Sequence, residues 1–345
     1  MYDIVIQKID LNSSEKDKVD EFLRGFDLIL DKDAEYTIAA KAGNKIVGTC
    51  SFAGKVLKCF AVSESMQGEG LASKLITHLT NILFDRGVYE TFIFTKPKNK
   101  SIFEGTGYKE VHEVEGVVLL EGGIANVKSY VDKMFKKSQL KNGKKAALVM
   151  NCNPFTLGHR YLIESAAKEN DEVVVFVVEE NKSSFPFEVR LELVKKGVED
   201  LKNVIVIPGG NYIISSATFP TYFLRQKDER LLAYTKLDAE IFGKYIAKAF
   251  HIVKRYVGTE PYCSVTNSYN KTLNEVLSKY EVEVKLIDRL VVGEKAVSAS
   301  DVRGLLKSGE LEEIKNIVPK TTYEFLISEA AKPIIERLKR SDLPH

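Results

Sequence analysis

The chain has 345 residues, a length that predicts two domains rather than one hydrophobic core. Its 44% hydrophobic and 28% charged residues are typical of a globular protein in water, and the net charge of +2 gives no indication of a nucleic-acid or membrane partner. We expect neither a transmembrane helix nor a signal peptide, because no apolar run approaches ~18 residues and the N-terminus lacks a basic stretch. The four cysteines lack metal-binding spacing, so we expect reduced thiols, a cytoplasmic location and no metal held by protein side chains alone.

Residues 1–124 alternate strand and helix patterns, which predicts a first domain built on a mixed sheet. A helix is expected over residues 14–28, with a serine at its start as the N-cap. The expected strands occupy residues 3–9, 36–40, 46–52, 56–62, 89–94 and 117–120.

The fourth of these strands leads into QGEGLA, at residues 67–72, and then into an apolar-periodic helix. A glycine-containing turn at the start of a helix offers backbone N–H groups to a phosphate. The turn resembles the pyrophosphate-binding turn of GNAT acetyltransferases, and the resemblance implies that it binds a CoA-like group. Its key positions are Gln67, Gly68, Gly70 and Ala72.

Residues 102–108 resemble the late helix, turn and strand of the same fold. Many GNAT enzymes carry a tyrosine general acid in this segment, whereas Phe103 stands there in this chain. Because a phenyl ring cannot donate a proton, we expect this domain to bind a CoA-like group rather than to transfer an acetyl group.

Residues 125–145 are predicted to connect the two domains. Apolar residues of the first part follow helical spacing along one stripe, at Val127, Tyr130, Val131, Met134 and Phe135. The polar sequence KNGKK at residues 141–145 is interpreted as the junction, with its lysines exposed to solvent.

The second domain is predicted over residues 146–345. Near-continuous Val/Ile runs indicate strands that are covered on both faces, and helical segments separate them. These patterns predict a Rossmann-like, doubly wound parallel sheet. The apolar runs lie at residues 146–150, 172–178, 204–207 and 253–258.

The sequence NPFTLGH, at residues 153–159, follows the first of these strands, and Asn153 and Phe155 lie at the strand end. The start of a helix at this point is suited to bind phosphate. Gly158 lets the backbone approach a phosphate, His159 can donate to a phosphoryl oxygen, and Thr156 adds a hydroxyl donor. The neighbouring Cys152 is expected to be a small core residue.

The sequence VSASDVR, at residues 297–303, begins a second helix. Ser298, Ser300 and the backbone amides near Asp301 are expected to form a capped helix start that can bind an anion, and Arg303 can neutralise departing pyrophosphate. Each motif alone matches an ordinary helix start equally well. Together they predict a site where a nucleophile attacks the α-phosphate of a nucleotide, with positioning and charge stabilisation as the catalytic contributions.

The combination of T-x-G-H and S-x-S-x-x-R is similar to the nucleotidyltransferase superfamily, which includes pantetheine-phosphate and nicotinate-nucleotide adenylyltransferases. Within it, the chain resembles the citrate lyase ligase family over roughly its whole length, because that family also carries an acetyltransferase-like N-terminal domain. The stretches that carry this resemblance are ISSATFPTYFL at residues 214–224, RYVGTEP at 255–261 and ASDVR at 299–303.

The resemblance implies that acetate attacks the α-phosphate of ATP, that pyrophosphate leaves, and that the thiol of the prosthetic group on the acyl carrier subunit of citrate lyase takes the acetyl group. It implies Mg²⁺ bridging the phosphates, and it places Gly258 and Glu260 near the adenosine. The residues expected to bind the triphosphate are Thr156, His159, Ser298, Ser300 and Arg303.

Several alternatives remain open. Residues 217–223, which include Phe219, either shape a pocket for acetate or the thiol arm of the carrier, or form a core-packing loop. Arg190 is a further candidate contact for phosphate or the acyl carboxylate. The chain can also be another adenylyltransferase, or a GNAT protein acetyltransferase with a nucleotide-sensing domain; Phe103 weighs against the latter.

Overall fold

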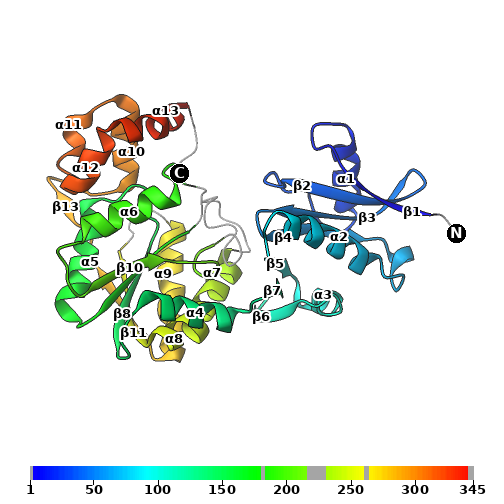
Figure 1. Cartoon of the computed structure of the whole chain (residues 1–345), viewed down its shortest axis with the longest axis horizontal. Helices are drawn as coiled ribbons and strands as arrows, with labels where there is room; N and C mark the ends of the chain where they lie inside the picture. Colours follow the sequence, from blue (N-terminus) through cyan, green and yellow to red (C-terminus); the bar gives the residue numbers. More distant parts are fainter. Residues whose placement is uncertain (1–2, 180–182, 216–230, 260–263, 341–345) are drawn as a thin grey trace. The chain divides into compact units, whose positions relative to one another are not determined.

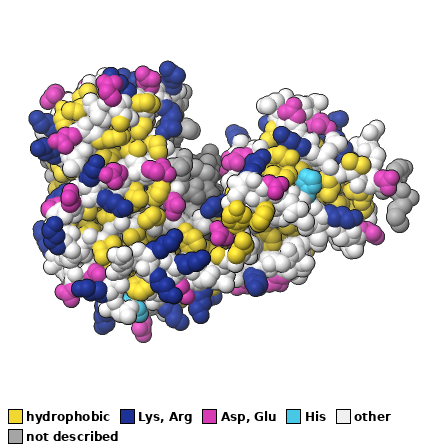
Figure 2. All heavy atoms as spheres, viewed as in Figure 1, with side chains coloured by type: hydrophobic (Ala, Val, Ile, Leu, Met, Phe, Trp, Pro, Cys, Tyr) yellow, Lys and Arg dark blue, Asp and Glu magenta, His cyan; other side chains and the backbone are white. Residues whose placement is uncertain are grey.

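The computed structural model describes residues 3–179, 183–215, 231–259 and 264–340 (Figure 1). The chain divides into two compact units, Met1–Ser129 and Tyr130–His345. In the part of the chain that is described, no helix has the length and apolar character needed to cross a membrane. On the face seen in Figure 2, basic and acidic side chains are intermingled rather than gathered by sign.

The first unit is a seven-stranded sheet in the order β1-β2-β3-β4-β5-β7-β6. Its neighbouring strands are antiparallel except β4 and β5, so the predicted GNAT-like mixed sheet is confirmed. The strands are β1 (Ile4–Lys8), β2 (Tyr36–Ala42), β3 (Lys45–Ala53), β4 (Val56–Val62), β5 (Glu90–Thr95), β6 (Lys109–Val114) and β7 (Val117–Gly123).

Helices α1 (Glu15–Arg24) and α2 (Leu71–Asp85) cover opposite faces of this sheet. The alternation of strand residues explains this arrangement, because Ile38 packs in the core under α2 while its neighbour Ala39 packs in the core under α1. Short helical segments complete the unit: η1 (Glu64–Met66), η2 (Pro97–Asn99) and α3 (Lys100–Glu104).

The second unit contains a five-stranded parallel sheet in the order β10-β9-β8-β11-β12. All five residues of β9 are buried, as expected for a strand covered on both faces, and the predicted doubly wound sheet is confirmed. The strands are β8 (Lys145–Met150), β9 (Val173–Val177), β10 (Val204–Pro208), β11 (Ile252–Gly258) and β12 (Glu283–Ile287).

Two groups of helices cover the two faces of the parallel sheet (Figure 1). Helices α5 (Leu157–Glu169) and α6 (Phe187–Gly197) share one core with β8 and β9. On the other face, Phe176 of β9 packs edge-on against Phe242 and Phe250. The segments on that side are α7 (Leu231–Ile241), the π-helix η4 (Phe242–Ala247), α8 (Lys248–Phe250), α9 (Ser264–Leu277) and η5 (Ser278–Tyr280).

Strands β8 and β11 are neighbours in the sheet although a long stretch of chain separates them. From β8 the chain winds outward through β9 to β10, and from β11 it winds the other way to β12. In open α/β sheets ligands bind at such a switch point, beyond the carboxyl ends of the strands. A ligand site is therefore expected at the carboxyl ends of β8 and β11.

The C-terminal segments form a helical cluster with its own apolar core, which includes Phe185, Val302, Leu306 and Leu326. This core fixes the position of α10 within the second unit. The segments are β13 (Val291–Val292), β14 (Lys295–Ala296), α10 (Ala299–Ser308), α11 (Leu311–Ile314), α12 (Lys320–Leu326), η6 (Glu329–Ala331) and α13 (Lys332–Arg340).

Helix α4 (Val127–Ser138) spans the division between the units, which falls inside the predicted connector. The expectation that all lysines of residues 141–145 are exposed is wrong for Lys145, which is 1% exposed. Its ammonium lies 3.2 Å from the Glu172 carboxylate and donates to the carbonyl oxygens of Lys141 and Gly143. These partners replace water, so the charge can be buried where β8 begins.

Candidate active site

A cavity of about 750 Å³ lies at the carboxyl ends of β8, β11 and β12, where the topology predicts a ligand site. Its lining includes the turn between β8 and α5, the end of β11 and the start of α10. The predicted residues of the second unit that line it are Asn153, Thr156, Gly158, His159, Gly258, Ser298, Ser300 and Arg303.

The first motif forms a capping box at the start of α5. The Thr156 hydroxyl accepts the His159 N–H at 3.3 Å, and the Thr156 N–H donates to His159 Nδ1 at 3.1 Å. The Leu157 N–H donates to the Ile317 carbonyl at 2.9 Å. No acceptor for the Gly158 N–H is found among the described residues, so this amide remains for a ligand oxygen.

These contacts determine the tautomer and the protonation state of the His159 imidazole. Because Nδ1 accepts a backbone hydrogen bond, the proton of the neutral imidazole resides on Nε2. Burial, together with the positive charge of Arg289, lowers the pKa of His159 from 6.5 to about 4. At neutral pH the side chain is therefore an uncharged donor through Nε2–H.

The protein without ligand should show this depressed pKa directly. In an NMR titration, we expect the His159 imidazole to titrate near pH 4. Because the folded pKa lies below the unfolded value, stability from neutral His159 is complete above about pH 6.5 and is lost as the pH falls towards 4. From pH 7 to pH 5, the Tm of His159→Gln should therefore fall less than the Tm of the parent protein. A His159 midpoint near 6.5 contradicts this assignment.

The second motif caps α10 in the same manner. The Ser298 hydroxyl accepts the Asp301 N–H at 3.1 Å and donates to the Asp301 carboxylate at 2.7 Å. The Ser298 hydroxyl is therefore occupied in capping the helix. The N–H groups of Ala299 and Ser300 have no acceptor within the described ranges. In this motif, the backbone amides are therefore the groups suited to bind an anion.

Arg303 joins the two motifs, which are 150 residues apart in sequence. Its Nη1 donates to the Asn153 carbonyl at 2.6 Å, and its Nη2 donates to the Ser300 hydroxyl at 3.2 Å. The side chain is buried at 7% exposure. One guanidinium thus fixes the start of α10 against the turn that precedes α5 and adds positive charge to the cavity wall.

Glycine at position 158 is needed for this approach. A Cβ built on Gly158 would lie 3.1 Å from the carbonyl oxygen of Val297, which is tighter than ordinary packing. The sequence predicted this glycine for its closeness to phosphate. The structure gives a second reason, since the residue also lets the two motifs lie against each other.

Phe155 lies outside the cavity lining. It is fully buried, and its ring stacks on the His159 imidazole with centroids 5.9 Å apart and planes at 14°. A Cβ on Gly197 would clash with it at 2.3 Å, so Phe155 fills a tight gap between α5 and α6. The geometry gives it a role in orienting His159.

Two predicted parts of the site, Glu260 and residues 217–223, fall outside the described residues.

Two other residues discussed in the sequence, Arg190 and Cys152, lie in the interior of the second unit. Arg190 is fully buried and donates to the carbonyls of Phe185, Asn151 and Val178, and it does not line the cavity. Its contacts hold loops together rather than a ligand. Cys152 is also buried, and burial raises the pKa of its thiol to about 12, which removes it as a nucleophile.

Sequence reasoning missed two cationic residues of the cavity, Arg255 on β11 and Arg289 just after β12. Arg289 Nε donates to the Thr259 carbonyl at 3.0 Å, which anchors its guanidinium beside the site. Their positions in the sequence could have indicated them, because Arg255 lies on a strand of the parallel sheet and Arg289 lies just after one.

The phosphate-binding turn of the first unit lies between η1 and α2. Gly68 and Gly70 adopt left-handed backbone angles, with φ of 82° and 70°, and no side chain caps the helix. The turn, including Gln67, is exposed, and Ala72 lies in the first turn of α2. Open N–H groups at a helix start fit a phosphate.

Phe103 is confined to the core of the first unit, where its ring packs against Phe60 with centroids 5.1 Å apart. The nearby Tyr108 is also buried, its hydroxyl lies 2.6 Å from the Thr91 hydroxyl, and burial raises its pKa. Neither side chain is placed as a proton donor at an open site.

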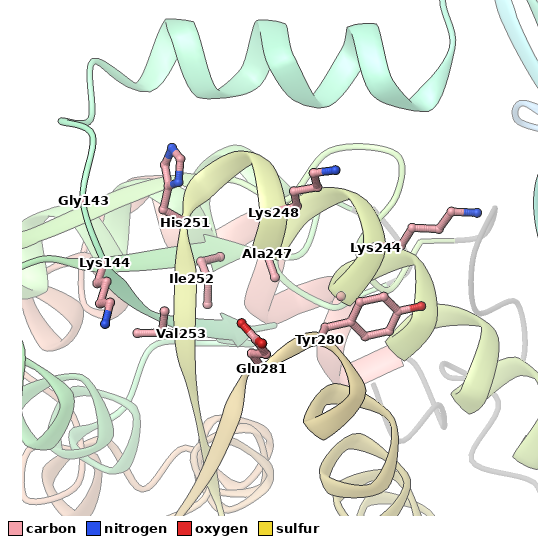
Figure 3. A pocket seen from close by; sticks show the side chains of 11 residues that line it. Gly143, Lys144, Lys244, Ala247, Lys248, His251, Ile252, Val253, Tyr280 and Glu281 are labelled. Atoms are coloured by element: carbon pink, nitrogen blue, oxygen red, sulfur yellow. The ribbon is translucent and has the colours of Figure 1, made fainter.

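A second cavity, of about 590 Å³, lies around the opposite ends of β8 and β11 (Figure 3). Its lining includes Lys144, Lys244, Lys248 and His251, but Figure 3 shows these side chains pointing in different directions. They do not converge on a common point, whereas the donors of the first cavity belong to two helix starts joined by Arg303. The first cavity is therefore the candidate active site.

The fold and this site define a class: a doubly wound α/β domain with two helix starts at one cavity, preceded in sequence by a GNAT-like mixed-sheet domain. Residues 145–326 match the family described as the citrate lyase ligase C-terminal domain, and residues 6–102 match the acetyltransferase (GNAT) family. The chain belongs to the citrate lyase ligase family and is an enzyme.

Three relatives with curated names match along nearly their whole length. The chain is 39% identical to the citrate (pro-3S)-lyase ligase of Escherichia coli (strain K12), over 90% of this chain and 89% of that one. It is 35% identical to the ligase of the same name from Klebsiella pneumoniae, over 94% and 96% of the two chains. It is 33% identical to the ligase of the same name from Haemophilus influenzae, over 93% of this chain and 97% of that one. The resemblance stated from the motifs is thereby confirmed.

Proposed function

We propose that the protein activates citrate lyase by acetylating the thiol of the prosthetic group on its acyl carrier subunit. An acetate oxygen bonds to the α-phosphorus of ATP, and the bond to pyrophosphate breaks. The thiolate then attacks the carbonyl carbon of acetyl-adenylate, and the acyl C–O bond breaks to release AMP. The names of the relatives support the substrate, and the two helix starts support the chemistry.

The contact between Arg303 and the Asn153 carbonyl is the observation that carries this proposal. It brings to one cavity the amides of Gly158 and of the start of α10, which have no acceptor among the described residues and can hold the phosphates. His159 donates from Nε2 to the phosphoryl oxygens as charge develops on them. The neutral imidazole is suited to this task because it has a fixed donor and needs no proton transfer.

The cavity fits a Mg²⁺ ion that arrives with the nucleotide. Its lining includes the carboxylates of Asp288 and Asp301, but no cluster of three metal-binding side chains occurs in the described parts of the chain. Mg²⁺ is commonly held by one or two carboxylates together with substrate phosphates. When bound, the ion neutralises charge on the phosphates.

The reaction can be tested by product analysis. Incubation with ATP, Mg²⁺, acetate and deacetylated citrate lyase should give AMP and pyrophosphate in equal amounts, together with acetylated carrier. Both products should depend on acetate. Pantetheine phosphate and nicotinate mononucleotide serve as competing acceptors, and formation of a dinucleotide product without acetate would contradict the proposal. Acetylation by acetyl-CoA in the absence of ATP would contradict it as well.

We further propose that the first unit binds the CoA-like prosthetic group of the carrier at residues 67–72. The exposed turn and the uncapped start of α2 support phosphate binding. The buried positions of Phe103 and Tyr108 support a binding role without acetyl transfer.

Ser73→Glu tests this role without damaging the helix. Ser73 is exposed in the first turn of α2, where a carboxylate stabilises the helix but repels a phosphate. We expect the KM for carrier protein to rise about tenfold, with the KM values for ATP and acetate unchanged. The matched control is Thr77→Glu, one exposed turn later. Equal carrier KM values for the two variants would sink the proposed site.

A further inference from the structure

Two buried donors of Arg255 lack an acceptor in the part of the chain that is described. The side chain rises from β11 and is 1% exposed, and its Nε and Nη1 have no hydrogen-bond partner among the described residues. Nor does any described carboxylate form an ion pair with it. A guanidinium cannot lose its charge at physiological pH, so this arrangement is costly in the absence of an anion.

The remaining contacts hold the guanidinium in place. Its Nη2 donates to the Tyr269 hydroxyl at 3.2 Å, and that hydroxyl donates to Asp238 at 2.8 Å. The charged group also lies 4.2 Å from the centroid of the Phe242 ring. These contacts fix the orientation of Arg255 but use only one of its three nitrogens, and Asp238 is reached only through the phenol.

Arg255 also lines the cavity that contains both phosphate-binding helix starts. It stands on the strand next to β8, at the switch point of the sheet. The backbone amides of α5 and α10 and the side chains of His159 and Arg303 already provide the phosphate donors. A second kind of anion is needed in the same cavity, namely the carboxylate that attacks the α-phosphorus.

We propose that Arg255 binds the carboxylate of the acid substrate. The inference rests on the proposed function, because it assumes that a small monocarboxylate reacts with ATP in this cavity. A carboxylate that shares one oxygen with Nη1 or Nε satisfies the unpaired guanidinium and keeps its other oxygen for attack on phosphorus. The Tyr269–Asp238 contact positions Arg255 for this role. Asp238 also holds the backbone at Ile214, whose N–H donates to the Asp238 carboxylate at 2.9 Å.

Arg255→Met is the test, with Lys254→Met as the matched control, since Lys254 is the neighbouring lysine on the same strand and lies outside the cavity lining. We expect Arg255→Met to raise the acetate KM about 10- to 100-fold with the ATP KM unchanged, and Lys254→Met to change neither. Because two of the three lost nitrogens have no hydrogen-bond partner among the described residues, and only the contact with Tyr269 is given up, the Tm of Arg255→Met should stay at or above that of the parent. A purely structural role would instead lower the Tm and leave the acetate KM unchanged.

A second readout does not depend on turnover. Acetate alone should raise the Tm of the parent protein and of Lys254→Met, but not that of Arg255→Met. If Arg255→Met does not fold, Arg255→Lys decides, because it keeps the charge but loses the planar fork and should still raise the acetate KM. An unchanged acetate KM, or a rise in the ATP KM alone, overturns the assignment. If the parent itself forms no AMP from ATP and acetate, it is the proposed function that fails.

Discussion

Replacement of His159 by alanine is expected to lower kcat by ~10²–10³-fold and to change the KM for ATP much less. The reason is that Nε2–H is a donor fixed in place by the hydrogen bond from the Thr156 N–H to Nδ1. Such a donor contributes mainly when charge develops on the phosphoryl oxygens, so its loss affects the chemical step more than binding. Steady-state rates of pyrophosphate release at saturating ATP and acetate measure the effect.

His78→Ala is the control for this variant, because His78 is an exposed histidine on α2 in the first unit. It should keep the parent kcat. The Tm of both variants establishes that they are folded. Turnover of His159→Ala within a few-fold of the parent would remove His159 from the catalytic machinery.

Arg303→Met is expected to have the largest effect of any single change, because it acts on both motifs. It removes the link to the Asn153 carbonyl and one positive charge of the cavity wall. A buried carbonyl left without its donor costs about 1–3 kcal/mol, so the free energy of unfolding should fall by that amount. We expect kcat/KM for ATP to fall by ~10³-fold or more, since the charge and the alignment of the helix starts are lost together.

Two variants separate these contributions. Arg303→Lys keeps the charge but cannot reach both the Asn153 carbonyl and the Ser300 hydroxyl, so its kcat/KM should be intermediate. Lys307→Met removes a charge from the same helix one turn later, at an exposed position, and should leave kcat/KM unchanged. If Arg303→Met loses stability but keeps its kcat/KM, the residue is structural only.

The sequence predicted the parts of the site that rest on local patterns. A turn from a strand into a helix, with Thr156 and His159 at fixed spacing, can be recognised without the fold. The same is true of the N-cap residue Ser298. Continuous Val/Ile runs predicted the central strands because a strand buried on both faces has no polar alternation.

The parts that were missed depend on tertiary contacts. Strand β12 lies at the edge of the sheet and has no fully buried residue, so its sequence lacks the apolar run of the central strands. Arg255 and Lys145 resemble ordinary exposed charges in sequence and are buried only because the fold supplies Phe242 and Glu172 as neighbours. The roles of Phe155 and Gly158 in aligning the motifs also required the structure.

The most direct test of attack at the α-phosphorus uses acetate labelled with ¹⁸O in both oxygens, in a complete reaction with ATP, Mg²⁺ and deacetylated citrate lyase. If acetyl-adenylate forms at the joined helix starts and the thiol attacks its carbonyl carbon, the bridging oxygen leaves with AMP. Mass spectrometry should then find one ¹⁸O atom in each AMP and none in pyrophosphate. Unlabelled AMP, or label in the β- or γ-phosphate products, would contradict the proposed chemistry.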